Sequence, residues 1–375
     1  MKTGSHLHGF ADFREQARRS LPVRVFDFID GGAGDEAGMA RNRMSYRDRT
    51  LTPRVGVDVR DVSLACAFPW GRAAAPFGIA PVGLTGLIHP QADRMLATAA
   101  ARANIPYIVS ACANTSIEDI AHASGRAPWF QFYMPSSGRW DPLIRRVQEA
   151  GCPTLVLTLD AAAPGRRLRD LRNGLSLPLR TGLRDLLRNP RWLHDQKRGP
   201  PLGFPNLPGA ESLSRGTSFS ELMASQTGGA MSWADIARIR AAWPNTLMVK
   251  GVMDVRDAEQ ALALGVDAIV VSNHGGRQLD CSPAPLHAVE GMVQAGVRPE
   301  ALLVDSGVRS GEDIVKALHA GAGMVLLGRA FLFALAAEGP QGVERLIQQL
   351  LAETRTCMRL VGTARIEDIH KTLGS

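Results

Sequence analysis

The chain has 375 residues, 45% of them hydrophobic and 21% charged, with a formal net charge of +7. This balance is ordinary for a globular protein, and no apolar run reaches the roughly 18 residues that a membrane-spanning helix needs. The five cysteines are scattered and form no CxxC pair, which argues against a disulfide framework and a metal site and favours the reducing cytoplasm. The arginines form no basic stripe interleaved with aromatic residues, so the charge indicates an anionic ligand and no nucleic-acid partner.

The first 76 residues are predicted to form a helical cap. Helical spacing of apolar residues covers Phe10–Ser20, Val25–Ile29 and Glu36–Arg47, and Gly31-Gly32 interrupts it. We therefore expect a single domain over residues 1–375, with the cap at 1–76 and the main fold at 77–360.

Eight short apolar runs then alternate with helical segments. The runs are rich in Val, Ile and Leu and show little alternation, as expected for parallel strands buried on both faces. Eight strand–helix units in series predict an α/β fold, a closed (β/α)8 TIM barrel. The predicted strands are Phe77–Val82, Tyr107–Cys112, Trp129–Met134, Thr154–Asp160, Leu247–Val252, Ala268–Asn273, Leu302–Asp305 and Met324–Gly328. Predicted helices between them include Trp233–Ala242, Val255–Leu264 and Gly311–Ala320.

One long insertion, residues 165–231, follows the fourth strand and is rich in Pro, Gly, Arg and Ser. Loops at the C-terminal ends of barrel strands lie on the catalytic face. Within the insertion, residues 183–193 combine leucines and Trp192 with three arginines. A basic amphipathic helix of this kind can lie in a membrane interface, which predicts a peripheral membrane contact. A lid packed on the barrel is an equally good interpretation.

The densest polar cluster follows the sixth strand, in the string SNHGGRQLD at Ser272–Asp280. A histidine can act as a base near neutral pH, and an arginine can bind a carboxylate with two parallel hydrogen bonds. We therefore predict His274 as a base and Arg277 as a carboxylate ligand. A solvated loop with a structural histidine is the weaker interpretation of this string.

Charged residues also end the neighbouring strands. Lys250 ends a buried strand, where it needs a partner: an electron-rich cofactor edge or a simple salt bridge. After the fourth strand, Asp160 is placed to orient His274 and stabilise its protonated form, and Arg167 to join Arg277 at an anion. A solvated basic run is the alternative for this segment.

The seventh and eighth strands end in DSGVRSG at Asp305–Gly311 and in Gly328-Arg329. These loops form the usual phosphate site of the barrel, where glycines expose N–H groups and helix starts favour anions. Gly307, Arg309, Gly328 and Arg329 are therefore predicted to bind a phosphate. No GxGxxG follows a strand, so a dinucleotide site is not supported.

These strings resemble one family, the FMN-dependent α-hydroxy acid dehydrogenases and oxidases. The resemblance runs from Leu21-Pro22 through Ala330–Gly339 and rests on SNHGGRQLD, VKG at Val249–Gly251, DSGVRSG and LGRAF at Leu327–Phe331. Within the family, Asn189–Trp192 looks most like the bacterial mandelate dehydrogenases. The resemblance implies FMN as cofactor and oxidation of an (S)-2-hydroxy acid to the 2-oxo acid.

The resemblance also implies partners and roles. Electrons would pass to quinone or another acceptor, at the inner face of the membrane if the insertion binds there, and the chain would form a homo-oligomer, a tetramer by family resemblance. An oxygen-using oxidase and an L-lactate dehydrogenase are alternatives, and a flavoprotein without activity or a flavin-free phosphate-binding barrel are more distant ones. His274 and Asp160 would be catalytic, and Arg277, Arg167 and Tyr133 would bind substrate. The residues implied to bind FMN are Ala80, Pro81, Ser110, Gln131, Thr158, Lys250, Ser272, Asp305, Gly307, Arg309, Gly328 and Arg329.

Three positions depart from the pattern that the family usually shows. Phe28 stands where a tyrosine hydroxyl usually helps to bind the carboxylate, a contact worth ~1.5–3 kcal/mol. Cys112 stands where glycolate oxidases carry a tryptophan, which leaves room for a larger substrate. Gly83 stands where oxidases commonly carry alanine, which favours a dehydrogenase. Together they predict a bulky or aromatic 2-hydroxy acid.

Overall fold

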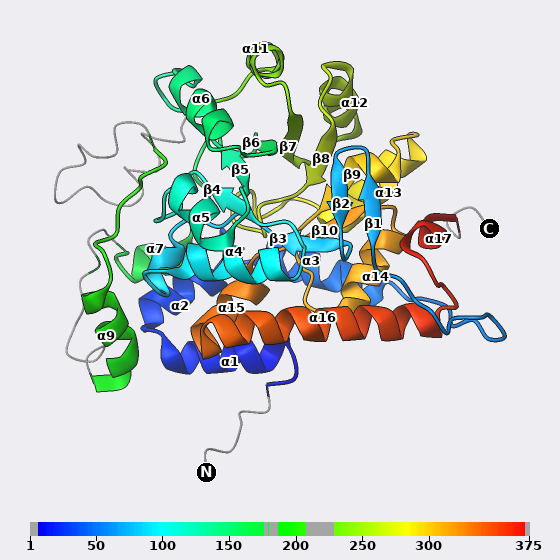
Figure 1. Cartoon of the computed structure of the whole chain (residues 1–375), viewed down its shortest axis with the longest axis horizontal. Coiled ribbons are helices and arrows are strands. Elements are labelled where there is room, and N and C mark those ends of the chain that lie inside the picture. The colour runs from blue at the N-terminus through cyan, green and yellow to red at the C-terminus, as the bar shows by residue number, and fades with distance from the viewer. Residues whose placement is uncertain (1–6, 176–178, 180–186, 208–228, 372–375) are drawn as a thin grey trace.

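Eight parallel strands form one sheet in the order β3-β10-β9-β8-β7-β6-β5-β4 (Figure 1). In this computed structural model, residues 7–175, 179, 187–207 and 229–371 are described. A parallel bridge joins Ile79 to Tyr107, so the end strands β3 and β4 meet and the predicted barrel is closed. The strands are β3 (Phe77–Ile79), β4 (Ile108–Ser110), β5 (Trp129–Phe132), β6 (Thr154–Thr158), β7 (Thr246–Val252), β8 (Ala268–Val271), β9 (Leu302–Val304) and β10 (Met324–Leu327).

Helices surround the barrel, and each strand overlaps a predicted one. Among the described residues, no helix has both the length and the apolar character needed to cross a membrane. The helices that follow the strands are α4 (Ala92–Arg102), α5 (Ile117–Ser124), α6 (Asp141–Glu149), α11 (Trp233–Ala242), α12 (Val255–Ala263), α13 (Pro285–Gln294), α14 (Gly311–His319), α15 (Arg329–Glu338), α16 (Pro340–Leu360) and α17 (Ile366–Lys371), with 3₁₀ turns at Thr85–Leu87 and Pro299–Ala301.

The barrel interior changes from apolar to polar along its axis. Side chains two residues apart on a strand point the same way. The buried apolar members of these pairs, such as Ile108, Val156 and Met248, form one cluster inside the barrel. Two residues further along the same strands come Ser110, Thr158 and Lys250, all buried and polar. The C-terminal ends of the strands therefore carry a polar floor on a packed apolar core.

A short hairpin closes the other end of the barrel and was not predicted. β1 (Cys66–Phe68) and β2 (Gly71–Ala73) pair antiparallel within the cap that was expected to be helical. Trp70 stacks on Phe68, with ring centroids 4.2 Å apart, and meets Trp129 edge-on at 5.4 Å. Neither strand contains Val, Ile or Leu, and each buries only one of its three residues, so both lack the apolar run that predicts the barrel strands.

The three predicted N-terminal helices are confirmed to within two residues. They are α1 (Phe10–Ser20), α2 (Val23–Asp30) and α3 (Ala37–Asp48). α1 packs along α15, where the rings of Phe10 and Phe333 lie 5.5 Å apart, and Phe26 of α2 stacks on the same ring at 5.8 Å. The cap thus covers the part of the barrel where β10 leads into α15.

In the described residues of the insertion there are two short helices, α7 (Leu168–Arg172) and α9 (Pro190–Arg198). Of the predicted amphipathic segment 183–193, residues 183–186 lie outside the described residues. In the described part, Leu187 is 75% exposed whereas Trp192 is 5% exposed, and the Trp192 indole donates to Leu87 O at 2.8 Å. Trp192 therefore packs on the protein and anchors α9 to the loop after β3, and a membrane contact through residues 183–193 stays a prediction.

Candidate active site

A large cavity lies at the C-terminal ends of the strands, where the polar side chains gather. All the residues predicted to bind substrate or cofactor or to act in catalysis line it, except Asp160 and Ser272. Phe10, Phe28 and Met39 of the cap complete its wall. The structure thus brings together side chains from all eight strand ends and from α1, α2 and α3.

His274 and Asp160 form a pair at the ends of β8 and β6. The Nδ1 atom of His274 lies 3.2 Å from both carboxylate oxygens of Asp160. Burial favours a higher pKa for Asp160, but the charge of His274 and its hydrogen bond outweigh burial, and the pKa falls below its usual value. Gly251 makes room for this carboxylate, since a Cβ there would lie 2.5 Å from Asp160 Cγ. Asp160 therefore lies behind His274 as an anion, and His274 Nε2 is the ring nitrogen left for a ligand.

Lys250 is buried with two partners of its own. Its Nζ donates to Ser272 Oγ at 2.7 Å and pairs with Asp305 Oδ2 at 2.9 Å. The Ser272 hydroxyl also accepts from the His274 N–H at 3.0 Å, so it holds these two residues and does not line the cavity. Lys250 therefore forms the predicted salt bridge and also lines the cavity, and its role at a cofactor edge stays a prediction.

A chain of hydrogen bonds crosses the polar floor. Ser110 Oγ donates to Gln131 Oε1 at 2.9 Å, and Gln131 Nε2 donates to Thr158 Oγ1 at 2.9 Å. Ala80 and Pro81 extend this floor after β3. The floor combines hydroxyl and amide groups with apolar surface, as a flat heteroaromatic ring with polar edges requires.

Two arginines face the cavity near α2. Arg277 donates from Nη1 to Phe28 O at 2.7 Å and to Gly31 O at 2.8 Å, and its Cζ lies 5.1 Å from the centre of the Phe28 ring. Burial, helped by the charge of Arg167, lowers the pKa of Arg277 well below its usual value. Arg167 Nη1 lies 3.9 Å from Asp170 Oδ2, and its buried Nε has no hydrogen-bond partner within the described residues. Such uncompensated guanidinium groups favour an anionic ligand.

The part of the cavity wall formed by Gly83 and Cys112 has small side chains. Gly83 and Cys112 are in contact, since a Cβ at Gly83 would lie 2.7 Å from Cys112 Cβ. Burial raises the pKa of the Cys112 thiol to about 12, so this wall is uncharged. Tyr133 lines the cavity after β5, and burial raises its pKa above the usual value, which keeps its hydroxyl protonated.

The residues predicted to bind a phosphate lie at the starts of α14 and α15. Gly328 is the N-cap of α15, and Gly307 lies three residues before the N-cap of α14. Burial lowers the pKa of Arg329 to about 10 and also lowers that of Arg309, whose Cζ lies 4.3 Å from the Phe10 ring centre. A guanidinium stays charged in proteins, so these shifts indicate buried charge that an anion would compensate. The residues present therefore fit a phosphate-bearing ring cofactor.

Comparisons with known proteins agree with this geometry. A family model described as FMN-dependent dehydrogenase matches residues 17–374. The chain belongs to the FMN-dependent dehydrogenase family. It is 41% identical to a putative L-lactate dehydrogenase of Mycobacterium tuberculosis, over 96% of this chain and 86% of the relative. It is 37% identical to an (S)-mandelate dehydrogenase of Pseudomonas putida, over 97% and 93% of the two chains.

A solved structure extends the likeness to three dimensions. The crystal structure of a monotopic membrane protein, (S)-mandelate dehydrogenase, is 35% identical and superposes with a TM-score of 0.90 over 98% of this chain and 99% of that one. The barrel, the cap and FMN as cofactor are therefore properties of this protein. It is an FMN-dependent 2-hydroxy acid dehydrogenase or oxidase.

Several residues that support the site were not singled out from the sequence. Gln278 donates from Nε2 to Asp160 O at 2.6 Å and accepts from the Gly165 N–H at 2.9 Å, which ties the His274 loop to the insertion. Asp280 accepts from the Gly38 N–H at 2.7 Å at the start of α3. Both belong to the SNHGGRQLD string, so the density of polar residues there was the available signal.

Proposed function

We propose that the protein oxidises a bulky or aromatic (S)-2-hydroxy acid to the 2-oxo acid and passes the electrons to quinone or another acceptor. The observation that carries the proposal is the His274–Asp160 pair in one cavity with Arg277 and Arg167 and with the small side chains of Gly83 and Cys112. FMN supplies the two-electron acceptor when it is bound.

Each residue of the site has a specific role in this reaction. Arg277 and Arg167 bind the substrate carboxylate, which turns the substrate hydroxyl towards His274 and Tyr133. His274 removes a proton at Nε2, and the Asp160 carboxylate behind Nδ1 stabilises the imidazolium that results. Lys250, positioned by Ser272 and Asp305, would stabilise negative charge at the edge of the ring cofactor. These roles use groups that all line the cavity or touch one that does.

The shape of the cavity supports a large substrate. Neither Gly83 nor Cys112 fills the wall as a tryptophan at position 112 would. Phe28 offers its ring to Arg277 and has no hydroxyl for the carboxylate, so a small acid loses one hydrogen bond without gaining apolar contact. A substrate with a ring or a branched chain compensates by burying apolar surface. The L-lactate and (S)-mandelate relatives lie at similar identity, so cavity shape carries this choice.

Substrate preference is the test. Reduction of the flavin by each acid is measured without oxygen, as the loss of flavin absorbance. We expect a higher kcat/KM for mandelate-like acids than for lactate or glycolate. Phe28→Tyr should improve the small acids by at least roughly tenfold, since a hydrogen bond to a charge is worth ~1.5–3 kcal/mol. Phe28→Leu removes the ring without adding a hydroxyl and is the matched control. Glycolate or lactate as the best substrate would contradict the size argument, and rapid reoxidation by oxygen would favour the oxidase alternative.

A further inference from the structure

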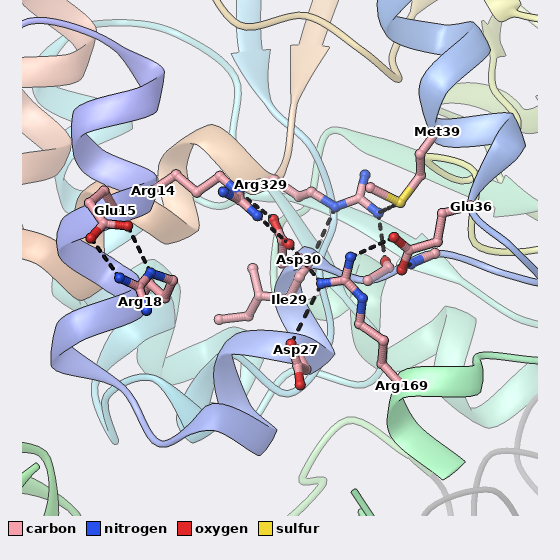
Figure 2. A network of polar contacts seen from close by, with 12 residues as sticks. Arg14, Glu15, Arg18, Asp27, Ile29, Asp30, Glu36, Met39, Arg169 and Arg329 are labelled. Atoms are coloured by element: carbon pink, nitrogen blue, oxygen red, sulfur yellow. Dashed lines mark hydrogen bonds and ion pairs between the residues drawn. The ribbon is translucent and has the colours of Figure 1, made fainter. Parts of the chain in front are cut away.

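The C-terminal end of α2 accepts hydrogen bonds from two of the arginines that line the cavity, Arg277 and Arg329. Ile29 O accepts from Arg329 at 3.0 Å (Figure 2). Phe28 O accepts from Arg277 at 2.7 Å, and Gly31 O accepts from both arginines, at 2.8 Å from Arg277 and 2.9 Å from Arg329. The last carbonyls of a helix lack partners within the helix, and arginine side chains can satisfy them. One helix end therefore sets how both guanidinium groups point.

A buried carboxylate fixes this helix end from the other side. Asp30, the last residue of α2, is 5% exposed and accepts from Arg14 Nε at 2.6 Å and Nη2 at 2.7 Å. It also accepts from Arg169 Nη1 at 2.8 Å, and Arg169 pairs in turn with Glu36 and Asp27 (Figure 2). Asp30 thus links α1, the end of α2 and the start of the insertion.

The position of Asp30 is unfavourable unless its partners are present. A helix C-terminus carries partial negative charge, and burial disfavours a carboxylate, so an aspartate there needs compensating cations. Burial works to raise the pKa of Asp30, but the hydrogen bonds from Arg14 and Arg169 outweigh it and the pKa is lowered. Arg169 is two residues from Arg167, so the same ion pair also fixes the start of α7.

We propose that Asp30 is a positioning residue that orients Arg277 and Arg329 through the end of α2, and so couples the carboxylate site to the cofactor-phosphate site. The inference rests on the proposed function, because it takes Arg277 as the carboxylate ligand and Arg329 as the phosphate ligand. Asp30 touches neither ligand and acts only through the carbonyls of Phe28, Ile29 and Gly31.

Asp30→Asn tests the proposal, because it keeps the shape of the side chain and removes its charge. Free flavin is measured by fluorescence after dilution of the holoenzyme, and KM and kcat are measured with the best 2-hydroxy acid at saturating FMN. We expect the dissociation constant of FMN and the KM to rise together, each at least fivefold. We expect kcat to stay within threefold of the parent, since His274 and Asp160 keep their contacts.

Glu15→Gln is the matched control. Glu15 pairs with Arg18 and Arg19 on the exposed side of α1, away from α2 (Figure 2). A second variant, Arg14→Lys, keeps the positive charge and loses the double hydrogen bond to Asp30, so it should show the same joint effect in weaker form. If Asp30→Asn does not fold, the FMN dissociation constant and the KM of Arg14→Lys test the proposal instead.

Two outcomes would overturn the proposal. One is an Asp30→Asn variant that matches Glu15→Gln in both constants, and the other is a change in only one of the two constants. Failure of the proposed function would be distinct, because no 2-hydroxy acid would then bleach the parent flavin. The FMN measurement would still decide whether Asp30 acts on Arg329.

Discussion

His274 has a restricted backbone conformation at the site. Its φ is +58°, in the left-handed region, which histidine enters more often than most residues but still at a cost of order 1–3 kcal/mol. Three groups fix this conformation and the ring: Ser272 Oγ accepts its N–H, Asp160 faces Nδ1, and Gly251 leaves space for that carboxylate. The surroundings determine the orientation of the ring before any ligand binds, as expected of a preorganised base.

His274→Ala should retain the flavin and lose turnover. A positioned base contributes on the order of 10²–10⁴-fold to the rate, and the backbone at 274 keeps its hydrogen bond to Ser272. Single-turnover reduction of the flavin by the best 2-hydroxy acid measures the effect. His287→Ala on α13 is the control histidine, because it does not line the cavity. A rate within threefold of the parent would remove His274 from the mechanism.

At the scale of elements, the strands and the long helices could be predicted because each repeats one local pattern. The runs at 77–82 and 324–328 are buried on both faces and bounded by turn residues, and they gave β3 and β10. The sequence also predicts which polar residues stand at the C-terminal ends of the strands, and Lys250, Asp305 and Arg329 are predicted in this way and line the cavity. A local sequence pattern does not show which distant residues a side chain will contact.

The missed features all depend on contacts between distant segments. The β1–β2 hairpin is stabilised by Trp129, about sixty residues later in the chain, and Trp192 is buried because α9 packs on the loop after β3. Asp30 likewise reads as one more polar residue of an amphipathic helix, since its partners Arg14 and Arg169 lie on other elements. No spacing rule brings these residues together.

We predict that the described part of the insertion contacts a membrane through exposed leucines and not through Trp192. Leu171 on α7 and Leu187 beside α9 are 62% and 75% exposed, and α7 and α9 lie on the same side of the molecule in Figure 1. Arg172, Arg188 and Arg191 around them are exposed as well. Exposed leucines with basic neighbours favour an anionic lipid surface.

Co-sedimentation with anionic phospholipid vesicles tests this surface. We expect binding at low salt that weakens at high salt, because screening reduces the basic contribution. Leu171→Ser with Leu187→Ser should lower the partition at least tenfold, since full burial of one leucine is worth about 1.5–3 kcal/mol. Val55→Ser is the control, because Val55 is 94% exposed and lies near the far end of α16. If the parent protein does not bind vesicles at low salt, the membrane contact is contradicted and the lid interpretation of the insertion is favoured.

For the whole molecule, the net charge of +7 is partly explained by the cavity. Lys250 and His274 have carboxylate partners there, whereas Arg277, Arg309 and Arg329 are half-buried, and desolvation lowers their pKa values. The folded chain without ligand therefore holds buried positive charge beside two helix starts. An anion that binds there compensates this charge, so cofactor binding and global stability are linked.

Thermal unfolding of protein stripped of its cofactor tests this link. At about 100 times its dissociation constant, a ligand stabilises the folded state by about 2.7 kcal/mol, which for a chain of this size corresponds to a rise in Tm of roughly 3 °C. We expect FMN to give this rise and riboflavin, which lacks the phosphate, to give much less at the same concentration. FAD should be no better than riboflavin, because the chain has one phosphate site and no dinucleotide motif. Equal stabilisation by FMN and riboflavin would mean that Arg309 and Arg329 do not bind the phosphate, and FAD released from the native protein by heat would contradict FMN as its cofactor.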